Sequence, residues 1–128
     1  MIQTQSKLKV TDNSGGKIAQ CIKVLGGYQK RYARTGDQIV VAVKKAKIPV
    51  GRNLKVKVKK GSVNKAILIR TRKPLQRKDG SSISFAENAT LLLNAQEQPV
   101  GTRIIGPIPY ELKRYKGIRL ASLASGII

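Results

Sequence analysis

Short apolar runs, separated by turn residues at fairly even intervals, restrict this chain to a fold built mainly of β-strands. The runs alternate with period two or last only a few residues, which is typical of strands rather than helices. Glycine, proline, asparagine and aspartate mark the turns between them. Many short strands at such spacing are typical of a small closed barrel. We expect strands at residues 18–25, 39–43, 54–58, 66–69, 83–85 and 89–93.

A long segment of one charge sign lies in the middle of the chain, because no acidic residue occurs between Asp37 and Asp79. Over all 128 residues, 26 lysines and arginines stand against 6 aspartates and glutamates, for a formal net charge of +20. A compact domain with this charge repels itself unless a polyanion neutralises it. The 41% of hydrophobic residues suffice for one folded domain with a modest core. The sequence therefore predicts a folded protein that binds nucleic acid through its phosphates.

Two parts of this segment indicate where phosphates are contacted. Residues 54–59 alternate between aliphatic residues and lysine, so a strand there places Lys55, Lys57 and Lys59 on one outer face. The alternative is a solvated edge strand whose lysines deter aggregation. Residues 70–80 lie between two strands and predict a long hairpin loop that closes near residues 79–80, with five cations at or near its tip. The alternative there is a disordered basic loop.

Metal and catalytic chemistry lack most of the residues that they need. The chain has no histidine, and its single cysteine, Cys21, lies in an apolar run. A disulfide within the chain and a Cys/His metal site are thereby excluded, and Cys21 is expected in the core. The acidic residues are scattered, without a carboxylate cluster for Mg²⁺, and we expect Asp12 and Asp79 to bond backbone groups in turns. We expect no enzyme, cofactor or metal site.

Aromatic residues are few, which argues against a free-standing binder of single strands such as an RNA chaperone. Binding through phosphates and shape suits structured RNA better. Tyr28 and Tyr32 flank Lys30 and Arg31, so this loop would be able to stack a flipped base while its cations hold the phosphates. The alternative places one ring in the core and uses the other to cap the barrel surface.

The pattern changes after Pro109, where Glu111 and the cations that follow predict a short helix over residues 110–116. Residues 118–128 are too apolar for a free tail and are expected to pack on the barrel or on a neighbour. No stretch approaches the roughly 18 apolar residues of a membrane span, and no secretory signal is visible. A lipid surface is also disfavoured as the partner, because the lysines alternate as in strands rather than along one helix face.

Several motifs recur in the order and spacing of one known family. The most specific runs from Ala66 through residues 67–69 and 79–80 to Phe85, Asn88 and residues 91–92. Others lie at residues 1–3, 12–15, 21–27, 31–33, 36–37, 97–99, 101–104, 106–107 and 111–112. Over essentially the whole chain they resemble the universal family of large-subunit ribosomal protein fourteen, in its bacterial and organellar branch. Two departures are Leu91, where the family usually has valine, and residues 124–128, which replace a commoner ending that contains proline.

This resemblance implies a mainly β fold: a five-stranded barrel with a projecting basic hairpin and a short C-terminal helical part. A single domain is expected, with the barrel at about residues 1–106 and the C-terminal part at about 107–128. The resemblance also implies a structural constituent of the large ribosomal subunit that binds large-subunit rRNA and helps form an intersubunit bridge to small-subunit rRNA. Implied protein partners are large-subunit ribosomal proteins three and nineteen and the ribosome-silencing factor. For that factor Thr102, Arg103 and Arg119 align with docking positions, and no homo-oligomer is expected.

The residues expected to contact rRNA are cations of the middle segment and of the loop between the two tyrosines. They are Lys30, Arg31, Lys44, Lys45, Lys47, Arg52, Lys55, Lys57, Lys59, Lys60, Arg70, Arg72, Lys73, Arg77 and Lys78. The high charge, residues 44–47 and the unusual C-terminus favour an organellar ribosome, in the mitochondrial matrix, over one in the bacterial cytoplasm.

Overall fold

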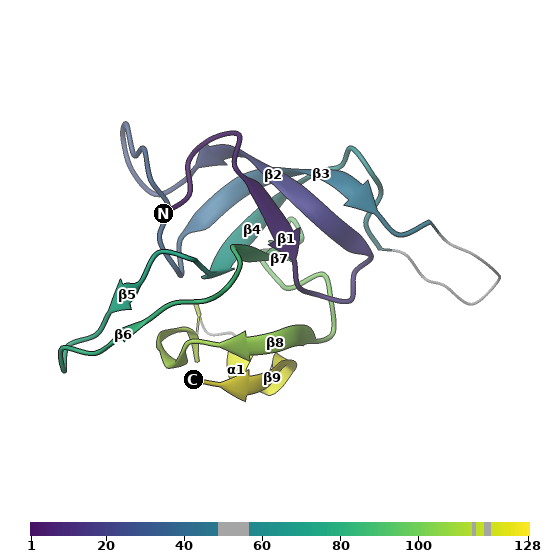
Figure 1. Ribbon diagram of the computed structural model, residues 1–128. Coiled ribbons are helices and arrows are strands. Elements are labelled where there is room, and N and C mark those ends of the chain that lie inside the picture. Colours follow the sequence, from purple (N-terminus) through teal and green to yellow (C-terminus); the bar gives the residue numbers. More distant parts are fainter. Residues whose placement is uncertain (49–56, 114, 117–118) are drawn as a thin grey trace.

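The computed structural model describes residues 1–48, 57–113, 115–116 and 119–128. Five strands form a closed barrel (Figure 1): β1 (Lys7–Val10), β2 (Gly16–Val24), β3 (Gln38–Ala46), β4 (Val63–Arg70) and β7 (Ala89–Leu93). Neighbouring strands are antiparallel except for β1 and β7, which pair in parallel and close the barrel. The predicted mainly β fold with a five-stranded barrel is confirmed.

The inside of the barrel is filled by alternate residues of its strands. In β3, Ile39, Val41 and Val43 are fully buried while the residues between them are partly exposed. Leu8 of β1 points into the same core, as does Cys21 of β2. The predicted burial of Cys21 is confirmed, and burial raises the pKa of its thiol. Each aliphatic side chain buried here stabilises the fold by about 1.5–3 kcal/mol.

Strand β7 and residues 66–69 of β4 are buried on both faces, which explains why they appear in the sequence as largely continuous apolar runs. Leu68 points into the barrel, whereas the neighbouring Ile69 belongs to a second core on the outer side of the sheet. The C-terminal part of the chain covers this outer side. The buried members of the second core are Ile69, Leu91, Ile104, Ile108, Leu112 and Leu120.

A hairpin of β5 (Leu75–Gln76) and β6 (Ser82–Ile83) projects from the barrel (Figure 1). At its tip, Asp79 accepts hydrogen bonds from the backbone N–H of Ser81 at 3.0 Å and from its hydroxyl at 2.6 Å. Gly80 follows with a φ of +88°, a conformation that glycine adopts without steric cost. The hairpin predicted for residues 70–80 is therefore confirmed, and it is ordered by its own turn chemistry.

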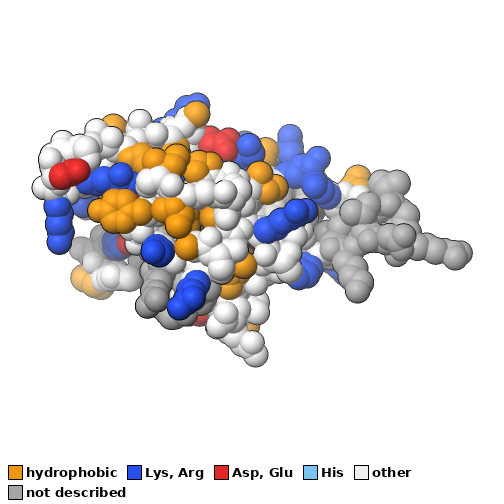
Figure 2. Space-filling view, turned by 90° about the horizontal axis from the view of Figure 1, so that it is seen from below, with side chains coloured by type: hydrophobic (Ala, Val, Ile, Leu, Met, Phe, Trp, Pro, Cys, Tyr) orange, Lys and Arg blue, Asp and Glu red, His pale blue; other side chains and the backbone are white. Residues whose placement is uncertain are grey.

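The C-terminal part begins with β8 (Ile104–Ile108), which pairs in parallel with β9 (Ala124–Ile127). Between them lie a 3₁₀ turn (Tyr110–Leu112) and the short helix α1 (Leu120–Leu123). Seen from below, hydrophobic side chains gather on this face of the molecule (Figure 2). A short C-terminal helical part is confirmed, and the apolar end of the chain packs back as predicted.

The helix predicted over residues 110–116 is wrong beyond its first turn. Lys113 and Lys116 lie outside any helix, and Lys116 has a φ of +44°, which no α-helix accommodates. Tyr115 instead packs against the second core. Tertiary burial of this ring thus overrides the local helix signals.

The strand predicted at residues 54–58 lies largely outside the described residues. Lys57 and Val58, which are described, belong to no strand. Their exposure nevertheless follows the predicted alternation, since Lys57 is exposed and Val58 is buried. Strands β1, β5, β8 and β9 are not among the strands predicted from the sequence, although β5 lies within the predicted hairpin loop.

Candidate nucleic-acid interface

A hollow with a lysine rim lies at the end of the barrel where β3 finishes. Its apolar lining consists of Ala46, the buried Val58 and the exposed Ile48. The chain leaves β3 here and returns through residues 57–60. Lysines from both segments therefore line the same hollow as Lys17 of β2. We call this surface the lysine hollow; its lysines are Lys17, Lys44, Lys45, Lys47, Lys59 and Lys60.

The lysines of this hollow are exposed and carry uncompensated charge. Among the residues that the structure describes, none of the six forms an ion pair with a carboxylate. Five of them were predicted as rRNA contacts, and Lys17 was missed because it precedes the one-signed segment. The available signal in the sequence was its position directly before the strand predicted at residues 18–25. Arg52 and Lys55 lie outside the described residues, while the ammonium of Lys57 donates to the carbonyl of Val100 at 3.1 Å.

The hairpin supplies a second basic surface, but its cations are used in different ways. Lys73 and Lys78 are exposed, as is Arg72, whose Nε donates to the carbonyl of Ala86 at 2.8 Å. A hollow at the hairpin base brings Lys73 together with Arg34, a cation that sequence reasoning did not select. We call Arg34, Arg72, Lys73 and Lys78 the hairpin surface.

Arg77 fastens the hairpin to the C-terminal part rather than pointing freely outward. Its Nε donates to Glu111 at 2.7 Å, and its guanidinium lies 4.5 Å from the ring centre of Tyr110. Nη2 also donates to the carbonyl of Ile128 at 2.7 Å. The hydrogen bond to Glu111 raises the pKa of Arg77. This arginine therefore orients the hairpin relative to the rest of the molecule.

Arg70 was expected on the basic loop, and the structure corrects this position. Its side chain lies inside the protein, with the residue only 5% exposed. Nη1 donates at 3.1 Å to the carbonyls of Ile105 and Pro107, and Nη2 donates to Glu87 at 3.3 Å. Arg70 is the last residue of β4, and its side chain is buried because the C-terminal sheet covers it. Arg70 thus joins the barrel to β8 and has no free face for a phosphate.

The loop between β2 and β3 carries the two tyrosines. Tyr28 is 94% exposed and Tyr32 is 44% exposed, so the interpretation that placed one ring in the core is wrong. Lys30 is paired with Asp37 at 3.0 Å, whereas Arg31 is exposed. Of the two cations predicted here, Arg31 is the freer one.

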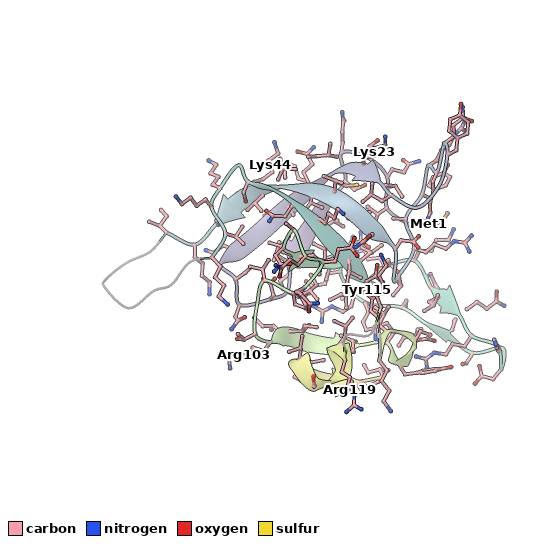
Figure 3. All side chains as sticks on the ribbon, turned by 180° about the vertical axis from the view of Figure 1, so that it is seen from behind. Met1, Lys23, Lys44, Arg103, Tyr115 and Arg119 are labelled. Carbon is pink, nitrogen blue, oxygen red and sulfur yellow. The ribbon has the colours of Figure 1, made fainter. Side chains whose placement is uncertain are left out.

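The hairpin surface and the lysine hollow lie at opposite ends of the barrel. The hairpin and the chain start are at one end, and the end of β3 is at the other (Figure 1). Side chains show the same separation, with Lys44 on one side and Met1 on the other (Figure 3). A closed barrel holds both ends at a fixed distance, because all five of its strands are paired on both edges.

A family model described as ribosomal protein L14p/L23e matches residues 1–128, the whole chain. The chain belongs to the ribosomal protein L14p/L23e family. Members of the L14p/L23e family are structural proteins of the large ribosomal subunit that bind rRNA, and they are not enzymes. The family therefore accounts for the high positive charge that the sequence carries.

Carboxylates serve structural roles in this L14p/L23e protein. Asp12 accepts hydrogen bonds from the backbone and hydroxyl of Ser14, and Asp79 does the same with Ser81, as predicted for turn residues. In the described part of the chain, no group of three or more potential metal ligands occurs. Within those same residues, no helix is long and apolar enough to cross a membrane.

The three residues predicted to meet a protein partner lie near the C-terminal part. Thr102 is held by Asn13, which accepts its backbone N–H and donates to its hydroxyl, each at 2.7 Å. Arg103 and Arg119 are exposed on the lower side of the molecule as drawn (Figure 3). Arg119 lines a hollow together with Gly101, which neighbours Thr102 in the chain. The fold thus brings parts of the chain that are distant in sequence to one side.

Proposed function

We propose that this ribosomal protein acts as a spacer between two rRNA segments, one bound at the lysine hollow and the other at the hairpin surface. The observation that carries the proposal is the presence of two exposed basic surfaces at opposite ends of a closed barrel. Exposed lysines and arginines bind phosphates and release counterions from RNA. Two such surfaces held apart suit an intersubunit bridge, in which one segment belongs to the large subunit and the other to the small subunit.

The salt dependence of binding tests the first half of this proposal. Two variants are compared: Lys44→Ala/Lys45→Ala/Lys59→Ala in the lysine hollow and Lys73→Ala/Lys78→Ala in the hairpin surface. Because the proposal assigns one end to each subunit, we expect the two variants to differ from each other in their affinity for protein-free large-subunit rRNA. Each phosphate contact that is lost makes the negative slope of log K against log salt less steep by roughly 0.7–0.9. A slope that stays unchanged in both variants would refute phosphate binding at these surfaces.

Subunit joining tests the second half. Large subunits that contain either variant are mixed with small subunits and sedimented through sucrose at moderate and high salt. We expect one set of substitutions to weaken incorporation into the large subunit, and the other to leave incorporation intact while reducing joined ribosomes. If both sets impair the same step, the two ends do not serve different rRNAs. Migration of the unaltered protein at the top of the gradient would instead indicate a free RNA-binding module.

We infer that the lower face meets proteins. Exposed Ile105, Tyr110 and Ile127 lie in or beside the C-terminal sheet, and Arg103 and Arg119 adjoin it. Partners of this face are large-subunit ribosomal proteins three and nineteen and the ribosome-silencing factor. Reversing both charges, with Arg103→Glu and Arg119→Glu, is expected to abolish binding of the silencing factor while the protein still enters the large subunit. Failure of assembly in this variant would show that these arginines contact rRNA instead.

We place the protein as a single copy in an organellar ribosome, in the mitochondrial matrix rather than the bacterial cytoplasm. The net charge of +20 and the C-terminal residues 124–128 support this assignment. Fractionation of the source cells, followed by detection of the chain in ribosomes from each compartment, tests it directly.

A further inference from the structure

Tyr28 is the most exposed of the large hydrophobic side chains in the described residues, at 94%. A single exposed ring needs no explanation by itself, because soluble proteins commonly leave some apolar side chains in water. The arrangement of the loop that carries it is more informative. This loop carries the ring on a backbone that is anchored at both ends, and exposed Lys23 and Arg31 precede and follow the ring in the sequence.

The backbone around Tyr28 is fixed at both ends. Leu25 donates its N–H to the carbonyl of Gln38 at 3.1 Å, and Ile2 and Ala33 exchange two backbone hydrogen bonds of 2.9 and 2.8 Å. Gly26 and Gln29 have φ values of +102° and +52°, so the chain turns sharply on either side of residues 27–28. These bonds restrain the backbone of the loop at its base, which lowers the conformational entropy that the backbone loses when a partner covers the ring.

The loop is also closed by an ion pair across its base. Lys30 pairs with Asp37 at 3.0 Å, and the backbone N–H of Arg34 donates to the same carboxylate at 2.8 Å. Both interactions engage Asp37, which is the only acidic residue in the chain between Asp12 and Asp79. Arg31 and Lys23 are exposed, and neither forms an ion pair within the described part of the chain. Lys23 lies at the edge of the barrel on the side opposite the C-terminal part (Figure 3).

An exposed aromatic ring on the same loop as an exposed arginine is a combination that fits one kind of RNA feature. The ring offers a face for stacking, and every nucleobase has a complementary face. Paired bases in an RNA helix do not expose that face, whereas bases in loops and bulges do. The cations can hold the phosphates on either side of such a base.

We propose that Tyr28 stacks on an unpaired base of rRNA, with Arg31 contacting a flanking phosphate. This contact is separate from the lysine hollow and the hairpin surface, and it rests on the rRNA binding argued above. It adds affinity of a different physical origin, because stacking depends little on salt whereas phosphate contacts depend on it strongly.

Binding of the full-length protein to protein-free large-subunit rRNA, measured over a range of KCl concentrations, tests the proposal. Tyr28→Leu should weaken binding by between about 5-fold and 150-fold, the range for loss of one aromatic–base stack. Its salt slope should equal that of the unaltered protein. Tyr28→Phe, which keeps the ring, should bind within about 2-fold of the unaltered protein. Arg31→Ala should instead make the negative salt slope less steep by about 0.7–0.9.

Thermal unfolding provides the control for structure, since a ring that is 94% exposed contributes little to the core and all variants at residue 28 should melt together. Unchanged affinity in Tyr28→Leu, with normal binding by the unaltered protein, would overturn this inference alone. An equal loss in Tyr28→Phe and Tyr28→Leu would also overturn it, because the hydroxyl would then carry the contact. Absence of rRNA binding by the unaltered protein would overturn the proposed function as well.

Discussion

Replacement of Arg70 by methionine tests how the barrel is joined to the C-terminal part. The guanidinium donates to the carbonyls of Ile105 and Pro107, both at 3.1 Å, and to Glu87 at 3.3 Å. Methionine has nearly the same volume, no charge and a flexible chain that ends short of the guanidinium position, so the cavity that it leaves is small. The variant therefore removes polar contacts without removing much packing.

The expected loss follows from these contacts. Each hydrogen bond from a charged donor contributes about 1.5–3 kcal/mol, so the two carbonyl bonds contribute about 3–6 kcal/mol together. The pair with Glu87, whose side chain is 39% exposed, adds about 0–1 kcal/mol. Burial also lowers the pKa of Arg70, which shows that the buried charge is itself unfavourable, and methionine relieves that cost. The net loss in the free energy of unfolding is about 2–4 kcal/mol.

Urea and thermal unfolding measure this change. For a chain of this size, each kcal/mol corresponds to roughly 3–4 °C, so the midpoint of Arg70→Met should fall by about 6–16 °C. Hydrogen exchange should show that the amides of β8 and β9 lose protection before those of the barrel. A variant as stable as the unaltered protein would refute a stabilising role for these contacts.

Gly106→Ala supplies a matched second variant. A Cβ at this position would overlap with Nη1 of Arg70, and the backbone φ is +91°. The steric conflict disappears when Arg70 is also replaced, whereas the backbone strain, about 1–2 kcal/mol, remains. The double variant should therefore be less destabilised than the sum of the single variants. Strict additivity would show that the two residues do not touch in solution.

Two further outcomes follow from buried groups of the barrel. Burial raises the pKa of Asp12 in the folded protein, so its ionised form costs stability that is recovered as the pH falls through that raised pKa. Asp12→Asn should therefore be more stable than the unaltered protein in urea at pH 7, with the difference shrinking at acid pH; an equal difference at both pH values would contradict this. The Cys21 thiol, buried and with a raised pKa, should react with a thiol reagent at least about 100-fold more slowly than in urea-unfolded protein, and rapid reaction of the native protein would contradict its burial.

The barrel was predictable from the sequence wherever a strand has a local signature. Residues 89–93 were expected as a strand with the bounds that β7 has. The hairpin was visible because residues 79–80 carry turn chemistry that acts over two or three residues. β1 shows the limit of this approach. Its short alternation in Lys7–Val10 resembles that of residues 54–59, and a period of two shows which face is buried without showing which strand lies alongside.

The candidate site was predictable in charge and only partly in position. Lys44, Lys45 and Lys47 lie on one surface because they follow one another at the end of β3. Arg70 belongs to the same basic segment, yet it is buried by carbonyls more than 30 residues away in the chain. No local pattern records such a contact. The exposure of Tyr28 was likewise unpredictable, because a tyrosine suits both a core edge and a wet surface.

The parallel pairing of β1 with β7 has a consequence for the order in which the protein forms. Lys9 lies opposite Ala89, so the first strand of the chain finds its last partner only after some eighty intervening residues have been synthesised. Until then β1 has one unpaired edge, and the apolar inside of the barrel stays open to water. Contacts this distant in sequence slow folding, because the intervening chain must be ordered before they form. During that interval, the strong mutual repulsion of the cations keeps separate nascent chains apart.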